Sequence, residues 1–428
     1  MLHRTPAPRP LAASLVLSLL LALALGATLL SGAALARTAR SPRAHAAIHN
    51  VLLVGSFNGK PGQYTTIQEA VDAAHPGDWV LIGPGDYKET GSRHVSGAYG
   101  DDLAAASVVV TTPNIHIRGM NRNTVVIDGT KPGSPQCSSA EGDQIFGPAE
   151  GESWQGNNGL LVYKANSVFV ENLSACNFLG ANHGGDAIWF DGGASSGKQE
   201  IGKWFGSWLT ATSTYWGGKS KPMGLYGIYA SNTVGPGAFD QTYASNMGDS
   251  GYYIGACPNC WATIDNGRAE GNDLGYSGSN SGGELVIENS EFKDNEEGVA
   301  TQSQNNDDAP PPQEGKCADE ALNPKPPKGA QRHDICWVMI HNKVIDNNDG
   351  NTPTSPAAPG LLGTGMTIAG GRNDLVVENT FSGNNAWGIL LVPFPATEAP
   401  PPQIPAEDHC RGGIGTGSGE SYVCNFDD

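Results

Sequence analysis

The sequence predicts an all-β fold, a right-handed parallel β-helix in which about ten rungs of short strands stack as a solenoid. Two columns of recurring residues and one N-terminal segment support this prediction. Glycines recur at spacings of 24, 24 and 23 residues and, later, of 23 residues: Gly227, Gly251, Gly275 and Gly298, then Gly365 and Gly388. A fixed period of this size indicates a solenoid, because one unit of that length cannot bury its own apolar face.

Five segments share an apolar alternation that ends in an acidic residue (once His) followed by Asn. They are Ser167–Asn172, Trp261–Asn266, Glu284–Asn289, Trp337–Asn342 and Asp374–Asn379. Alternation with a period of two predicts strands, so the solenoid is a β-helix with three short strands per turn. Six residues after the last four of these Asn stands a further Asn: Asn272, Asn295, Asn348 and Asn385. We expect stacked Asn side chains to hydrogen-bond from rung to rung at a tight turn.

A short amphipathic helix is predicted from Tyr64 to Ala74, before the first rungs. Thr66 and Glu69 have the spacing of a capping box, and Pro76-Gly77 ends the segment. We expect this helix to cover the open end of the first rung, which would otherwise expose apolar side chains and unpaired backbone groups.

The same segment carries a family resemblance. Tyr64-Thr-Thr-Ile-Gln-Glu-Ala-Val-Asp-Ala-Ala74, followed by Pro76-Gly-Asp78 and Pro84-Gly-Asp-Tyr87, resembles the entry segment of pectin-lyase-like β-helix proteins. The run Arg118–Gly129 is similar to the early rung of that superfamily, and the likeness extends from residue 51 to about residue 392. It implies the fold but no single reaction, since the superfamily holds lyases, hydrolases, esterases, epimerases and non-catalytic members.

Residues 47–428 lack the catalytic motifs of the pectinolytic families that share this fold. They contain no Arg-x-Pro-x-x-Arg run of the pectate lyases, no Gly-His-Gly or Arg-Ile-Lys of the polygalacturonases, and no Asp-Phe-Ile-Phe-Gly of the pectin esterases. No catalytic residue of those families therefore transfers to this chain.

Residues 1–46 read as a signal peptide and leader, and residues 47–428 as the β-helix domain. Arg4 and Arg9 precede an apolar run from Leu11 to about Ala36, and Ala34-Leu-Ala36 and Ala44-His-Ala46 offer small residues for cleavage. The apolar run is also long enough to span a bilayer, so an uncleaved anchor is the alternative. Cleavage predicts a secreted, extracellular protein.

The charge balance excludes some partners. The leader holds five Arg and no acidic residue, so the remainder has 20 Lys and Arg against 43 Asp and Glu, a net charge near −23. Such a surface repels nucleic acid and anionic membranes. A neutral polysaccharide is compatible with it, whereas an anionic one requires a bridging cation or local basic residues. We expect a monomer.

Eight Cys in an exported chain predict disulfides. We expect Cys317–Cys336 and Cys410–Cys424, and a structural disulfide of Cys257 and Cys260 with each other or with Cys137 or Cys176. Large loop insertions are predicted at 191–222, 303–335, 351–364 and 393–424. Because most of them leave from the same corner of the rung, they favour a binding cleft on one side, with surface decoration as the alternative.

Aromatic residues on and after the first insertion are candidates for substrate binding. These are Trp204, Trp208 and Trp216, together with Tyr229 and Tyr253, which alternation places on the outer face of adjacent rungs. Flat rings stack on sugars, and burial in the core is the alternative role.

Acidic residues and one histidine near this insertion are candidates for catalysis. His183, Asp186 and Asp191 surround one strand, and two carboxylates can act as general acid and base. Asp307 and Asp308, beside Asn305 and Asn306, would suit Ca²⁺, which prefers oxygen ligands. A solvated or turn-forming role is the alternative for both sets. A further column, Asp240, Asp265, Glu288, His341 and Glu378, is predicted to form a solvated outer face.

The sequence therefore favours a secreted β-helix protein that binds and cleaves or modifies a polysaccharide, as a lyase or a glycoside hydrolase. A non-catalytic glycan-binding or cell-surface protein is the second hypothesis, and a purely structural solenoid is the third.

Overall fold

A computed structural model describes most of the predicted β-helix domain. The described residues are 49–89, 95, 105–147, 149–150, 153–154, 156–181, 184–193, 201–219, 221–279, 281–302, 337–356, 359–369, 374–392, 414–415 and 422–423. The chain divides into two compact units, Met1–Ala47 and Ile48–Asp428, and the described residues belong to the second. Within them no helix is long and apolar enough to cross a membrane. The predicted leader lies outside the described residues.

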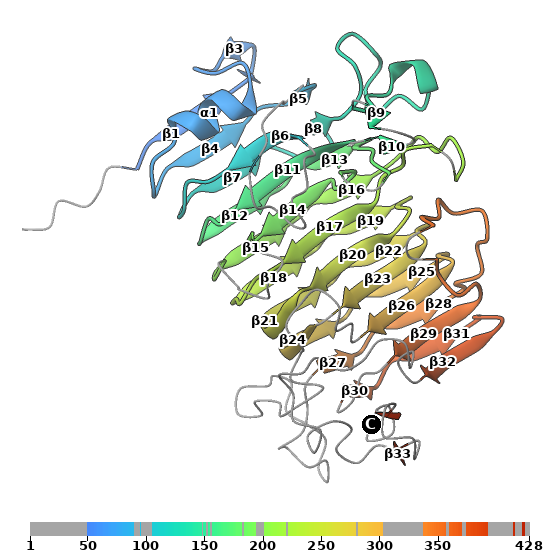
Figure 1. Cartoon of the computed structure of the whole chain (residues 1–428). Coiled ribbons are helices and arrows are strands. Elements are labelled where there is room, and N and C mark those ends of the chain that lie inside the picture. The colour runs from blue at the N-terminus through green and yellow to red at the C-terminus, as the bar shows by residue number, and fades with distance from the viewer. Residues whose placement is uncertain are drawn as a thin grey trace, which may run out of the picture. The chain divides into compact units, whose positions relative to one another are not determined.

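Three parallel sheets form the domain, and from β4 onward the chain visits them in the fixed order I, II, III (Figure 1). Sheet I contains β1 (Val51–Val54), β4 (Trp79–Ile82), β7 (His116–Gly119), β12 (Val168–Glu171), β15 (Trp204–Ser207), β18 (Gly237–Asp240), β21 (Cys257–Asp265), β24 (Ser281–Glu288), β27 (Trp337–Ile340) and β30 (Asp374–Val377). Sheet II contains β5 (Gly85–Tyr87), β8 (Val125–Asp128), β13 (Ser174–Cys176), β16 (Thr210–Thr212), β19 (Tyr243–Ser245), β22 (Arg268–Glu270), β25 (Glu291–Lys293), β28 (Lys343–Ile345) and β31 (Thr380–Ser382).

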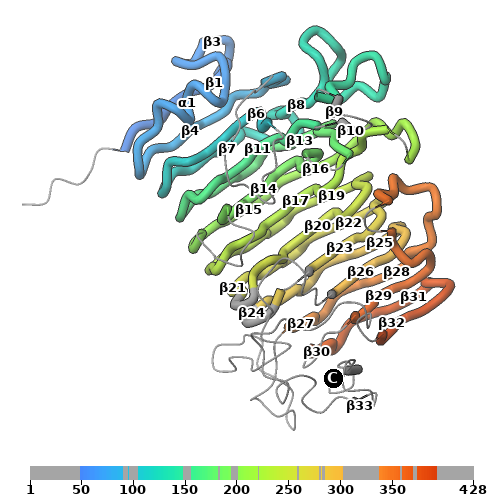
Figure 2. Tube along the Cα trace, in the orientation of Figure 1, coloured from blue at the N-terminus to red at the C-terminus, as the bar shows by residue number. Residues whose placement is uncertain are grey.

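Sheet III contains β6 (Ala105–Val110), β11 (Asn157–Tyr163), β14 (Ile188–Asp191), β17 (Tyr226–Ser231), β20 (Ser250–Gly255), β23 (Leu274–Ser279), β26 (Glu297–Gln302), β29 (Thr364–Ala369) and β32 (Trp387–Val392). Each strand pairs in parallel with its counterparts one rung before and one rung after, and the tube in Figure 2 follows this stacking from blue to red. The predicted parallel β-helix is confirmed. Antiparallel pairs lie outside the rungs: β2 (Ser56–Phe57) with β3 (Lys60–Pro61), β9 (Ala149–Glu150) with β10 (Ser153–Trp154), and β33 (Ile414–Gly415) with β34 (Tyr422–Val423).

The N-terminal helix forms as predicted. Helix α1 (Ile67–Ala73) begins after Thr66, whose side chain accepts from the backbone of Glu69 while the Glu69 carboxylate accepts from the backbone of Thr66. Its Ile67, Ala70 and Val71 are buried in the same core as the first strands of sheet I. The helix therefore covers apolar side chains at the start of the solenoid.

The column glycines allow adjacent rungs to approach closely at the start of sheet III. A Cβ atom built on Gly275 would lie 2.5 Å from the carbonyl oxygen of Gly298, and one on Gly298 would lie 2.5 Å from that of Gly365. Any side chain at these positions would collide with the backbone of the next rung. This explains why glycine is the residue that recurs once per rung.

The Asn ladder exists, but two of its four predicted members are wrong. Buried Asn272, Asn295 and Asn347 each donate from their backbone N and Nδ2 to the Oδ1 of the Asn on the next rung at 2.9–3.2 Å, and the ladder ends at the half-buried Asn384. The predicted members Asn348 and Asn385 lie one residue farther along the chain, where Asn385 N donates to Asn348 Oδ1 at 2.7 Å at an exposed position. The predicted register is one residue out for the last two rungs, because Trp337 pairs with Leu285 and not with Glu284.

The same shift breaks the predicted outer column of acidic residues. Asp240, Asp265 and Glu288 do pair with one another, but the residue opposite Glu288 is Ile340. His341 and Glu378 instead occupy the turn position with φ near +55°, where earlier rungs carry Asn266 and Asn289. His341 Nε2 and Glu378 Oε2 lie 2.6 Å apart in a solvent-exposed contact.

The predicted insertion at 191–222 is wrong in its extent. Residues 204–207 and 210–212 form the rung strands β15 and β16, so the chain departs from the rung only around residues 192–203 and again at 213–225. The described part of 351–364 lies between β28 and β29 and contacts earlier rungs. Residues 303–335 lie outside the described residues, as does nearly all of 393–424.

Two disulfides join described cysteines, Cys137–Cys176 and Cys257–Cys260. The predicted disulfide of Cys257 and Cys260 is thereby confirmed. The two residues are bonded to each other and not to Cys137 or Cys176. Cys317, Cys336, Cys410 and Cys424 lie outside the described residues.

Candidate functional site

An aromatic row lies on the outer face of sheet III. Trp189, Tyr229 and Tyr253 occupy the same position on three consecutive rungs. The Trp189 and Tyr229 rings stack with centroids 5.1 Å apart, and Tyr253 meets Tyr229 edge-on at 4.9 Å. These rings belong to an apolar cluster separate from the core, as expected for outward-facing side chains. They are, however, only 1–8 % exposed and Val95 packs against them, so they do not form the open platform that the sequence suggested.

Tyr226 joins this row because the strand bends at Gly227. A Cβ on Gly227 would point at the core residue Ala244, and the next residue, Ile228, is also in the core. Two consecutive inward positions place both Tyr226 and Tyr229 outside, with ring centroids 4.6 Å apart. Tyr226 keeps partial contact with solvent, while Tyr229 is buried.

Two carboxyl groups flank Tyr226. Asp249, at the start of β20, accepts a 2.7 Å hydrogen bond from the Ser250 hydroxyl and another from the Tyr226 hydroxyl. Asp186, two residues before β14, donates its backbone N–H to Asn158 Oδ1 at 3.0 Å, and its charge acts on Tyr226. We call Asp186, Tyr226, Tyr229, Asp249 and Tyr253 the Asp249 cluster.

The electrostatics of the Asp249 cluster suit proton transfer near neutral pH. Burial raises the pKa of Asp249 to about 6, although the hydrogen bonds from Ser250 and Tyr226 oppose this shift. Burial also raises the pKa of Tyr226 well above its usual value, with a further contribution from the charge of Asp249. Asp249 therefore exchanges a proton near pH 6 while the Tyr226 hydroxyl stays protonated.

Asp191 lies on the same sheet but is engaged differently. Its Oδ1 accepts from the backbone N of Gly193 at 2.8 Å and from the Ser231 hydroxyl at 3.4 Å. Ser231 in turn accepts from the indole N–H of Trp189. This fully buried carboxylate holds the turn after β14, which is the turn-forming role that the sequence left open beside catalysis.

The three tryptophans named from the sequence separate into two environments. Trp204 is fully buried between Phe190 and Phe239, with ring centroids 5.7 and 4.8 Å away. Its assignment to substrate binding is wrong, because β15 is a rung strand and not part of a loop. Trp208 and Trp216 are exposed, but they flank β16 of sheet II and so belong to a different sheet from the Asp249 cluster.

The remaining candidates are outside the described residues. His183, proposed for catalysis, and Asp307 and Asp308, proposed for Ca²⁺, all fall in this category, so their assignments stay predictions. Among described residues, one set of three metal-ligand side chains lies within 4.8 Å, namely Asp128, Cys137 and Cys176. Their two sulfur atoms are joined in the disulfide and are therefore not free to bind a metal.

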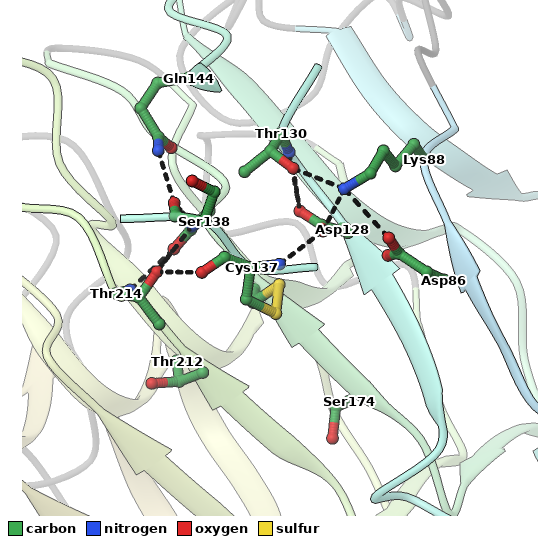
Figure 3. The surroundings of a disulfide bond; sticks show 12 residues. Asp86, Lys88, Asp128, Thr130, Cys137, Ser138, Gln144, Ser174, Thr212 and Thr214 are labelled. Carbon is green, nitrogen blue, oxygen red and sulfur yellow. Dashed lines mark hydrogen bonds and ion pairs between the residues drawn. A yellow bond between two sulfur atoms is a disulfide. The ribbon is translucent and has the colours of Figure 1, made fainter. Parts of the chain in front are cut away.

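The surroundings of that disulfide form a structural clamp (Figure 3). Lys88 lies between Asp86 and Asp128 and also contacts Thr130. Burial alone would raise the pKa of Asp128, but hydrogen bonds from Lys88 and from the backbone of Cys137 and Thr130 outweigh it, and the pKa is lowered. The ionised carboxylate thus anchors the segment after β8 to the first rungs.

A column of buried acids continues beyond Asp249 on the following rungs. Asp273 and Glu296 each stand two residues before a column glycine, as Asp249 does, and Glu297 stands one before. The segment between β28 and β29 covers them, since Gly360 N donates to Asp273 at 3.0 Å and Leu361 N to Glu297 at 2.8 Å. Burial raises the pKa of Asp273 to about 9 and that of Glu297 to about 7.

The sequence analysis missed Tyr226 and Asp249. The signal for Asp249 was present, because acids recur two residues before Gly251, Gly275 and Gly298. Tyr226 carried no such signal, since its outward orientation depends on the bend at Gly227.

No family model matches this sequence, and no curated protein matches it. Among solved structures, it is similar to an alginate lyase from Paenibacillus sp. str. FPU-7 (11 % identity, 81 % of this chain and 98 % of that chain, TM-score 0.40). It is also similar to the A-module of the mannuronan C-5 epimerase AlgE6 from Azotobacter vinelandii (14 %, 76 % and 74 %, 0.39). A third is the pectin methylesterase PemA from Erwinia chrysanthemi (12 %, 79 % and 92 %, 0.35). With every score below 0.5, these likenesses carry no information on the reaction or its residues.

Proposed function

We propose that this protein acts on a polysaccharide, which it binds and cleaves or modifies, and that Asp249 transfers the proton. The observation that carries the proposal is a carboxyl group with a pKa of about 6 in hydrogen-bond contact with Tyr226, a residue that is half-buried on the outer face of sheet III. Groups whose pKa values are shifted by burial next to a specific partner cluster at functional sites. An exported location is supported by the predicted leader and by the two disulfides, which persist in oxidising compartments.

The two groups have distinct roles in this proposal. Ionised Asp249 accepts a proton, either from a sugar carbon in a lyase or from an attacking water in a hydrolase. Tyr226 remains protonated because its pKa is raised. In the complex its single O–H turns from the Asp249 carboxylate to the sugar oxygen on which negative charge develops. Asp186 places a second carboxyl group beside the same phenol.

The first prediction concerns turnover. On a panel of polysaccharides, with unsaturated products measured by absorbance and reducing ends measured in parallel, Asp249→Asn and Tyr226→Phe should each lower the rate about 100-fold or more. The wild-type rate should rise with pH through about 6, because Asp249 acts in its ionised form, and Asp249→Asn should lack this rise. Asp240→Asn, on the outer face of sheet I, is the matched control and should keep the wild-type rate. Wild-type turnover in both cluster variants would refute the site.

A second candidate function, glycan binding without catalysis, is favoured by the exposed Trp208 and Trp216. Absence of products on both channels, in the presence of Ca²⁺ and of EDTA, together with retention on a polysaccharide matrix, would establish this alternative and exclude catalysis at Asp249.

A further inference from the structure

The chain from Trp208 to Trp216 alternates regularly between outward and inward side chains. The outward set is Trp208, Thr210, Thr212, Thr214 and Trp216, and the inward set is Leu209, Ala211, Ser213 and Tyr215. The two tryptophans at the ends are 49 and 40 % exposed, whereas the four inward side chains are buried. An exposed indole is unusual, because burial of so large an apolar group normally stabilises the fold.

Between the two tryptophans the outer face of sheet II is uncharged and rich in hydroxyl groups. Thr210 pairs with Ser174 on one side and with Tyr243 on the other. The Thr212 and Ser245 hydroxyls lie 2.8 Å apart. This neutral area lies in a chain of net charge −18, so it does not arise from overall composition.

Trp208 is held in place at one end of this area. Its backbone has φ of 53°, a conformation that a bulky residue rarely adopts and that earlier and later rungs give to Asn172, Gln241 and Asn266. The Arg122 guanidinium lies 5.4 Å from the centre of the indole, and its Nη1 donates to the Gln241 carbonyl at 3.0 Å. The indole is therefore oriented at the surface despite a local backbone cost.

Trp216 stands at the other end, on a segment held by the chain that follows β8. The Thr214 hydroxyl donates to the Cys137 carbonyl at 2.6 Å, and Lys221 pairs with Glu141 at 2.7 Å. Figure 3 shows Thr212, Thr214 and Ser174 beside the disulfide that fixes Cys137. The segment that carries Trp216 thus rests on a cross-linked neighbour.

We propose that Trp208, Trp216 and the hydroxyl groups between them form a binding surface for a neutral polysaccharide, here called the β16 surface. Sugar rings present apolar C–H faces, which stack on indoles, and hydroxyls, which pair with Thr, Ser and Tyr hydroxyls. The rings stand at most about 26 Å apart along an extended chain, so one glycan chain contacts both only if it spans several sugar rings. The surface lies on sheet II, and it binds independently of proton transfer at the Asp249 cluster on sheet III.

The occupant is a glycan and not an apolar protein segment because the two rings are separated by polar groups. A docking helix or strand requires contiguous apolar contact, which a row of three threonines does not supply. An anionic chain is disfavoured, since this area has no basic side chain between the tryptophans and the protein as a whole is acidic.

The test is affinity electrophoresis and titration calorimetry of the full-length mature protein against soluble neutral polysaccharides: a β-glucan, a xylan and a mannan. Trp208→Ala and Trp216→Ala should each weaken binding about tenfold or more, measured with the polysaccharide that binds the wild-type protein. Trp208→Phe should keep part of the affinity that Trp208→Ala loses. Trp261→Ala is the matched control, because Trp261 is 54 % exposed in the middle of the long strand β21 of sheet I.

Each outcome decides the proposal. Binding of Trp208→Ala and Trp216→Ala at wild-type strength, or equal weakening by Trp261→Ala, would overturn it. The same holds if the wild-type protein binds none of the neutral polysaccharides. Asp249→Asn should bind as the wild type does. Weakened binding in the tryptophan variants together with wild-type turnover in Asp249→Asn would support the β16 surface and refute the proposed catalysis, whereas wild-type binding in the tryptophan variants together with lost turnover in Asp249→Asn would refute the β16 surface alone.

Discussion

At the scale of single residues, buried carboxyl groups set the pH dependence of stability. The folded-state pKa values of Asp273, about 9, and Glu297, about 7, lie above the ordinary values of 3.8 and 4.5. A carboxyl group whose pKa is raised in the folded state makes its full contribution to stability below about pH 4, where it is protonated in both the folded and the unfolded state. That contribution is lost as the pH rises through the window between the ordinary and the folded values. We therefore expect the melting temperature to fall by several degrees between pH 5 and pH 9.

Asp273→Asn tests this assignment, because the amide keeps an acceptor for Gly360 N but cannot ionise. Between pH 5 and pH 9 the melting temperature of the variant should fall less than that of the wild type. Calorimetry at pH 5, 7 and 9 measures this difference. Asp240→Asn should follow the wild type. A flat wild-type profile, or a variant with an unchanged profile, would show that these carboxyl groups do not set the pH dependence.

At the scale of the strand, the column glycines control how closely two rungs approach. Gly275→Ala would bring a Cβ to 2.5 Å from the Gly298 carbonyl and to 2.9 Å from the Asn295 amide, so the two rungs must separate. We expect a loss of about 2–4 kcal/mol in the free energy of unfolding, measured by chemical denaturation. Gly142→Ala is the control, since nothing lies within 4 Å of a Cβ at that position. Equal stability of the two variants would contradict the role given to the column.

The strand scale also shows what the sequence could predict. Period-two alternation, the glycine spacing and the capping box predict the parallel β-helix and the helix α1 correctly. The predicted register fails where His341 and Glu378 replace Asn at the positive-φ turn, because the sequence pattern alone aligns Asn342 with Asn289. Trp204 was assigned to a loop because its rung lacks the Asn signature: Trp208 itself occupies that turn.

The candidate site was predictable only in part for a related reason. Alternation placed Tyr229 and Tyr253 on the outer face, and Asp186 was named as a catalytic candidate near the first insertion. Whether outward rings are open or covered depends on residues distant in sequence, such as Val95, and no local pattern indicates this. The contact of Tyr226 with Asp249 likewise requires the three-dimensional bend at Gly227.

At the scale of the whole molecule, each rung is stabilised mainly by its two neighbours, so the links between rungs determine how cooperatively the solenoid unfolds. The Asn ladder is such a link across four rungs. Asn295 is central to it: its Oδ1 accepts from Asn272 N and Nδ2, while its own Nδ2 donates to Asn347 and to the Ala269 carbonyl. All of these groups are buried, and backbone hydrogen bonds from Gly271 N to Asp294 O and from Glu296 N to Asn272 O join the same turns.

Asn295→Ala would leave the donors of Asn272 without their acceptor and the Ala269 carbonyl without its side-chain donor, in a fully buried turn. We expect a loss of about 2–4 kcal/mol, because an unsatisfied buried polar group costs about 1–3 kcal/mol and more than one is created. The dependence of unfolding on denaturant should also become shallower, since the rungs before and after the break would no longer unfold together. Asn123→Ala, at an exposed turn, should alter neither quantity. A stability loss with an unchanged denaturant slope would show that the ladder stabilises its own turn without coupling the rungs.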